Sequence, residues 1–133
     1  GTLSGNPVAM AAGIAQLKEC LKENFYHDLQ RKTDMLVDGI KKNIEEKGYE
    51  ITIYNIGSIF WFAFSDMTHL TRADQINAGK MTLFAKVYHY LLENGIYFGP
   101  SGYEVGFVSA AHTEEDIDTT ITMINGAFYI AMQ

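Results

Sequence analysis

The sequence lacks several features that define whole classes of proteins. It has one cysteine, Cys20, in 133 residues, which excludes an internal disulfide framework and fits a reducing cytoplasm. We therefore expect a cytoplasmic protein in which Cys20, inside a helical pattern, is a packed thiol and not a nucleophile. No apolar run is long enough to cross a membrane, so we expect no membrane partner.

Positive charge is scarce and absent from the last third of the chain. The formal net charge is −6, and the last lysine or arginine is Lys86. Every charged side chain beyond it is acidic. Nucleic acids are bound by clustered lysine and arginine, so we expect no nucleic-acid partner. The composition, 47% hydrophobic and 20% charged, is that of one ordinary soluble globular domain.

The common catalytic and ligand-binding motifs are also missing. There is no Gly-x-Gly-x-x-Gly, no P-loop and no Gly-x-Ser-x-Gly nucleophile elbow. The four histidines have no metal-ligand spacing and Cys20 has no cysteine partner, so we expect no metal site.

Hydrophobic periodicity predicts two helices in the first third of the chain. Asn6 and Pro7 form a helix start, and the pattern continues to about Asn24. The first half of this helix is small and apolar nearly all round, which predicts burial on more than one side. A second helix is expected from near Asp28 to Lys47, with Gly48 ending it.

The rest of the chain predicts strands and two more helices. We expect a hairpin about Gly57-Ser58, a loop with one helical turn, a helix ended by Gly95 and a last helix begun by a Thr113–Asp116 capping box. The expected strands are 51–56, 59–64, 96–98 and 105–109. This order favours an α+β fold, a small mostly antiparallel sheet with helices packed on one face.

One segment, residues 99–113, stands out as a candidate site. Pro100 and the glycines forbid a regular helix and suit a turn that enters a strand. In its middle a single carboxylate, Glu104, lies among small and aromatic residues. Because burying a carboxylate without partners is costly, Glu104 is a candidate functional residue.

The N-terminal residues 1–7 allow two interpretations. Glycines, hydroxyls and free backbone N–H groups at a helix start suit an anion, especially phosphate. Simple capping by Asn6 explains the same residues. The residues alone leave both interpretations open.

Two segments carry a resemblance to a known family. Residues 1–13, GTLSGNPVAMAAG, resemble a segment of the class III, pyridoxal-phosphate-dependent aminotransferases of fold type I. Residues 100–117 are similar to the glutamate-1-semialdehyde 2,1-aminomutase family, in which a Pro-Ser-x-(Phe/Tyr)-Glu-x-x-Phe-x-Ser-x-Ala-His-Thr pattern occurs. Residues 57–60 match that family's hairpin. Tyr103 and Val105 stand where Phe and Ala are commoner, and neither change removes a polar group.

The resemblance implies a place within a larger enzyme. Residues 1–133 would be the single C-terminal domain of a longer fold type I pyridoxal-phosphate enzyme. Residues 1–24 would be an interdomain, active-site helix and residues 25–133 the small α+β domain. The start at Gly1, without an initiator methionine, is expected of a cut inside a longer protein, and processing would leave the same start.

The resemblance also implies an activity and roles for three residues. The full-length enzyme would be a homodimeric isomerase that converts glutamate-1-semialdehyde to 5-aminolevulinate in tetrapyrrole (porphyrin) biosynthesis, with pyridoxal or pyridoxamine 5′-phosphate as cofactor. Glu104 would lie near the substrate's amino groups. Gly1 and Thr2 would contact the cofactor phosphate of the neighbouring subunit. Ser101 and Gly102 would shape the turn that presents Glu104, and His112 would be structural.

Two other functions stay open at this point. One is a related class III aminotransferase with a separate amino acceptor, and the other is a non-catalytic interaction domain of the same fold. None of the lysines matches the family's Schiff-base motif, so the family's lysine would lie upstream. We therefore expect this fragment alone to be inactive.

Overall fold

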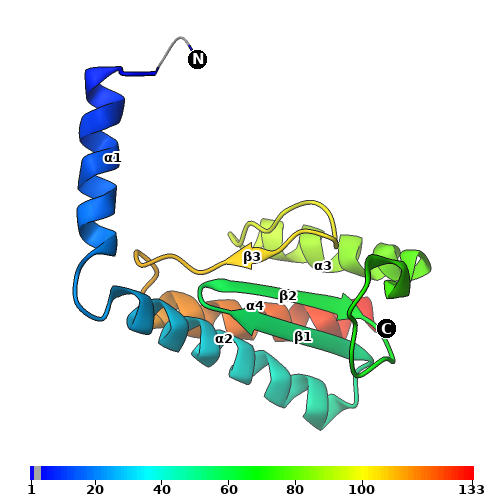
Figure 1. Ribbon diagram of the computed structural model, residues 1–133. Coiled ribbons are helices and arrows are strands. Elements are labelled where there is room, and N and C mark those ends of the chain that lie inside the picture. The colour runs from blue at the N-terminus through cyan, green and yellow to red at the C-terminus, as the bar shows by residue number, and fades with distance from the viewer. Residues whose placement is uncertain (2–3) are drawn as a thin grey trace.

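A computed structural model describes residue 1 and residues 4–133 of the chain (Figure 1). Its elements follow one another as α1 (Pro7–Cys20), α2 (Phe25–Lys47), β1 (Ile51–Ile56), β2 (Ile59–Phe64), two 3₁₀ turns (Ala73–Gln75 and Ala78–Lys80), α3 (Met81–Glu93), β3 (Gly106–Phe107) and α4 (Glu114–Ala131). No helix in this described part is long and apolar enough to cross a membrane.

The three strands form one antiparallel sheet in the order β1-β2-β3. β1 and β2 make the predicted hairpin, with Ile53 opposite Phe62. Gly57 in the turn has a φ of 57°, a left-handed conformation that glycine adopts without a steric penalty. The α+β fold class is therefore confirmed.

One face of the sheet and three helices enclose the core. Alternate residues of the hairpin point to this face, among them Ile51, Ile53, Phe60, Phe62 and Phe64. The helices contribute Leu36, Ile40, Val87, Leu91, Ile124 and Phe128. Figure 1 shows α4 running behind the hairpin, between α2 and α3, both of which it contacts. The three phenylalanines of β2 are thus part of the core.

The loop after β2 partly covers the other face of the sheet. Tyr54 and Trp61 stack there with ring centroids 6.1 Å apart. The Tyr54 hydroxyl accepts a 2.6 Å hydrogen bond from the backbone N–H of Leu70, and the Thr52 hydroxyl donates to the carbonyl of Met67. Tyr54 and Thr52 therefore hold the loop after β2 against this face, and Trp61 packs beside Tyr54.

The helix caps follow the sequence closely. Gly48 ends α2 with a φ of 64°, and Thr113 and Asp116 form the capping box of α4. The start of α2 is tied to the segment before α4, because Lys32 donates to the carbonyls of Ala110 and His112. These bonds fix the chain on the C-terminal side of β3.

Three predicted elements are wrong in extent. The first helix ends at Cys20 rather than Asn24, because Asn24 takes a left-handed φ of 63° between α1 and α2. Residues 96–98 are extended but join no strand ladder. The backbone N–H of Ile96 bonds instead to the Leu91 carbonyl at the end of α3. The last expected strand shortens to Gly106–Phe107.

The predicted burial of α1 is also wrong within this chain. No residue of α1 is buried, and Val8 and Leu17 are 77% and 64% exposed. Figure 1 shows the reason, since α1 stands clear of the sheet and of α3 and α4 and makes its main contacts with α2. Its apolar surface is therefore free in the described structure.

Candidate functional site

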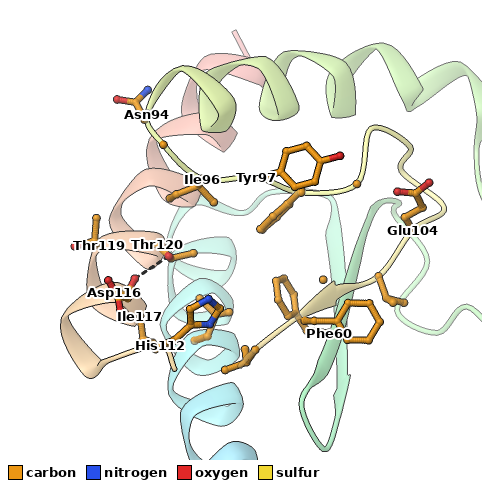
Figure 2. A pocket seen from close by; sticks show the side chains of 18 residues that line it. Phe60, Asn94, Ile96, Tyr97, Glu104, His112, Asp116, Ile117, Thr119 and Thr120 are labelled. Atoms are coloured by element: carbon orange, nitrogen blue, oxygen red, sulfur yellow. Dashed lines mark hydrogen bonds between the residues drawn. The ribbon is translucent and has the colours of Figure 1, made fainter. Parts of the chain in front are cut away.

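A cleft of about 630 Å³ opens between the extended segment 95–99 and β3 (Figure 2). Its apolar lining includes Leu36, Phe60 and Ile117. Polar side chains lie at its two ends, with Glu104 at one end and His112, Asp116 and Thr120 at the other. The cleft lies where residues 96–98 leave the edge of β3 unpaired, and the Ile96 backbone N–H bonds instead to the Leu91 carbonyl of α3.

The turn that carries Glu104 is held at three points. The Glu104 backbone N–H donates to the Ser101 carbonyl at 3.0 Å. The Gly102 carbonyl accepts a 2.9 Å hydrogen bond from Trp61 Nε1. Gly102 lies so close to α3 that a Cβ there would be 2.8 Å from Met81 Sδ. Ser101 and Gly102 thus shape this turn, and they fix it to both β2 and α3.

The Glu104 side chain is exposed, whereas its apolar sequence surroundings suggested burial. It makes no hydrogen bond or ion pair with any other residue that the structure describes. Water therefore solvates the carboxylate, and no desolvation cost has to be offset. The backbone of Glu104 is fixed, and its carboxylate is free at the end of a cleft. Such a carboxylate can bind a cationic group or a hydrogen-bond donor of a ligand.

The other end of the cleft is a hydrogen-bonded helix start. Asp116 accepts from the backbone N–H and the hydroxyl of Thr113 at 2.7 and 2.8 Å. The backbone bond first, and the hydroxyl second, lower the pKa of Asp116 below its ordinary value. His112 Nδ1 accepts from the Ser109 backbone N–H at 3.1 Å, which confirms His112 as a hydrogen-bonding residue before the cap.

Sequence reasoning missed the cleft itself and part of its lining. Asn94, Tyr97 and Thr120 come from three separate elements and meet only in the folded chain. Asp116 was recognised only as a capping residue. No local signal distinguishes these side chains, because each sits in an ordinary helix end or connecting segment.

The N-terminal candidates do not join this site within the chain. Gly1 is exposed. It lies beyond the N-terminal end of α1, which is the end of that helix farther from β3 (Figure 1). Thr2 lies outside the described residues. Asn6 Oδ1 accepts from the backbone N–H groups of Val8 and Ala9 at 3.0 and 3.2 Å, so the capping interpretation of Asn6 is confirmed.

Cys20 is half-buried at the end of α1. Its sulfur accepts a weak 3.8 Å hydrogen bond from Gln16 Nε2. Charge repulsion from Cys20, followed by a hydrogen bond to it, raises the pKa of the exposed Tyr26. The thiol is less enclosed than the sequence predicted.

The cleft does not by itself fit pyridoxal phosphate. Its lining contains two carboxylates, Glu104 and Asp116, and no lysine or arginine. A phosphate dianion placed there would meet negative side chains without a compensating cation. If the protein uses this cofactor, other residues must hold the phosphate.

Comparison with known proteins supports the fold. No model of a known protein family matches the sequence. An omega-transaminase from Sphaerobacter thermophilus superposes with a TM-score of 0.79 at 19% identity, over 97% of this chain and 29% of the transaminase. A transaminase with bound pyridoxal phosphate superposes with a TM-score of 0.75 at 24% identity, over 96% of this chain and 28% of its own.

These matches define the class of the fold. The chain has the fold of one region of the two superposed transaminases, and it spans under a third of the length of each. At these identities the likeness concerns the fold alone. The particular activity therefore has to be argued from the residues of the site.

Proposed function

We propose that this chain is the C-terminal domain of a pyridoxal-phosphate-dependent aminomutase that converts glutamate-1-semialdehyde to 5-aminolevulinate. The transaminase fold supports the class. The resemblance of residues 100–117 supports the particular reaction. The observation that carries the proposal is the unengaged Glu104 carboxylate, which a clamped turn presents at the end of a cleft without cations.

Glu104 is the residue of this chain that meets the substrate. A carboxylate there pairs with the ammonium of an amino substrate or accepts its proton during amino exchange. The cleft carries no positive side chain that would compete for it. Glu104 therefore selects for the amino-bearing part of the substrate.

The cofactor would be held mainly by residues outside this chain. When bound, pyridoxal phosphate supplies the electron sink for breaking bonds next to the substrate nitrogen. Gly1 and Thr2 would contribute contacts to the cofactor phosphate of the neighbouring subunit in a homodimer. We expect Thr2→Val in the full-length protein to increase cofactor loss on dialysis, and unchanged retention would remove Thr2 from this role.

The exposed apolar residues of α1 fit the proposed interdomain role of residues 1–24. Val8, Ile14 and Leu17 are all more than half exposed here. In a longer protein the same side chains would pack on the preceding part of the chain. Their burial would give the expected stabilisation of about 1.5–3 kcal/mol for each large apolar side chain that is fully covered.

The test is turnover of glutamate-1-semialdehyde by the full-length protein without any added amino acceptor. In the mutase reaction the substrate and the product each carry one amino group, and no second molecule accepts it. 5-Aminolevulinate should therefore form from the semialdehyde alone. If consumption of the semialdehyde instead depends absolutely on an added keto acid, the amino group leaves for a second molecule, and this would contradict the proposal.

A related transaminase with a separate amino acceptor is the second candidate. The names of both superposed structures favour it, since each is called a transaminase. It predicts an absolute acceptor requirement in the same assay. A non-catalytic interaction domain predicts neither cofactor absorbance nor turnover under any acceptor.

A further inference from the structure

We propose that Gly99 is a positioning residue for Glu104, because the space left by its missing side chain is the seat of the Glu104 carboxylate. This inference rests on the proposed role of Glu104. A Cβ built on Gly99 would lie 1.7 Å from Glu104 Oε2, 2.8 Å from Cδ and 2.9 Å from Cβ. The whole Glu104 side chain therefore lies against the Gly99 backbone, and not merely its flexible tip.

Backbone conformation does not explain the glycine at this position. Gly99 is not among the residues of positive φ, so its conformation is open to any amino acid. It precedes Pro100, which favours an extended conformation for any residue there. The close approach to Glu104 is the structural requirement that an alanine at position 99 would violate.

Neighbouring contacts make this seat a fixed one. The Trp61 bond to the Gly102 carbonyl and the packing of Gly102 on Met81 hold the turn at Gly102. Glu104 has no described hydrogen-bond partner to orient its carboxylate. Packing against Gly99 is therefore what sets the direction of the side chain, and Figure 2 shows the carboxylate turned toward the segment that carries Tyr97.

Gly99→Ala should displace the carboxylate without unfolding the domain. Oε2 must retreat by about 1.7 Å to reach ordinary contact at 3.4 Å from the new methyl group. The displaced side chain is exposed and free to turn into water. Because misplacing a catalytic group by about 1 Å can reduce turnover by roughly 100-fold, we expect kcat/KM to fall by about 10- to 100-fold.

The experiment is a double-mutant cycle in the full-length protein with its cofactor, using Gly99→Ala and Glu104→Gln. If Gly99 acts through Glu104, Gly99→Ala should lower kcat/KM in the wild-type background and change it less than about twofold in the Glu104→Gln background. Gly126→Ala is the matched control, since its added Cβ would contact the Tyr90 hydroxyl at 3.0 Å, away from the cleft.

Crystal structures of the three single variants supply a readout independent of activity. Gly99→Ala should move Glu104 Oε2 by more than about 1 Å, toward van der Waals contact with the new methyl group, while the hydrogen bond from Trp61 to the Gly102 carbonyl remains. An unmoved carboxylate, or a loss of activity equal in both backgrounds, overturns the inference while leaving the role of Glu104 intact. Wild-type turnover by Glu104→Gln instead refutes the proposed role of Glu104, and the crystal structures still decide whether Gly99 seats its side chain.

Discussion

Gly106→Ala should destabilise the strand that follows the candidate turn. Gly106 pairs with Phe60 across β2 and β3, and a Cβ at this position would lie 2.4 Å from Phe60 Cζ and 2.5 Å from Cε1. Ordinary carbon contacts are 3.4–4 Å, so the ring or the strand must move by about 1 Å. Phe60 is only 3% exposed and packs on Phe98 at 5.6 Å, which leaves it little room.

The expected cost is that of overpacking a core, about 1–3 kcal/mol in the free energy of unfolding. For a domain of this size each kcal/mol corresponds to a loss of roughly 3–5 °C in Tm. Urea denaturation followed by circular dichroism measures the loss. Phe60→Leu in the same chain should relieve part of it, because the smaller side chain leaves space for the methyl group.

Two results would refute this reasoning. Gly106→Ala could unfold at the wild-type urea concentration, which would show that β3 and Phe60 are not tightly packed. Alternatively, the effects of Gly106→Ala and Phe60→Leu could simply add, which would show that the two positions do not share one steric conflict.

Three other changes test separate parts of the structure. Asp116→Asn should lower the free energy of unfolding at pH 7, and its difference from wild type should disappear on acidification. The folded-state pKa of Asp116 lies below its ordinary value of 3.8, so the carboxylate stabilises the fold above pH 3.8 and loses this contribution as the pH falls through the folded pKa. A difference that persists at the lowest pH would contradict the charge argument. Thr113→Ala should cost about 0.5–2 kcal/mol by removing the cap of α4, measured by urea denaturation, and no change would contradict the capping box. Asn6→Ala should speed amide hydrogen exchange in α1 and leave the global unfolding midpoint unchanged, since α1 buries no residue; a lowered midpoint would show that α1 is coupled to the core.

The elements that local rules determine were predictable from the sequence. The hairpin was placed correctly because β-branched and aromatic runs flank Gly57, and the cap of α4 because Thr113 and Asp116 have the required spacing. The turn of Glu104 was located by its glycines and Pro100. In each case the signal lies within a few residues of chain.

The features that depend on tertiary contact were not predictable. Whether residues 96–98 join the sheet depends on a hydrogen bond from Ile96 to the end of α3. The exposure of α1 depends on whether another element of the chain packs against its apolar side chains, and none of the described elements covers them. The seat of Glu104 at Gly99 depends on a turn closing over five residues, and the sequence shows only that a glycine is present.

The role of Glu104 is the central claim, and Glu104→Gln in the full-length enzyme tests it most directly. Glutamine keeps the size of the side chain and removes its charge and its ability to accept a proton. We expect kcat for the amino-bearing substrate to fall by about 100-fold or more, with the urea midpoint unchanged because Glu104 has no described partner. Wild-type kcat in a variant that folds normally would contradict the account.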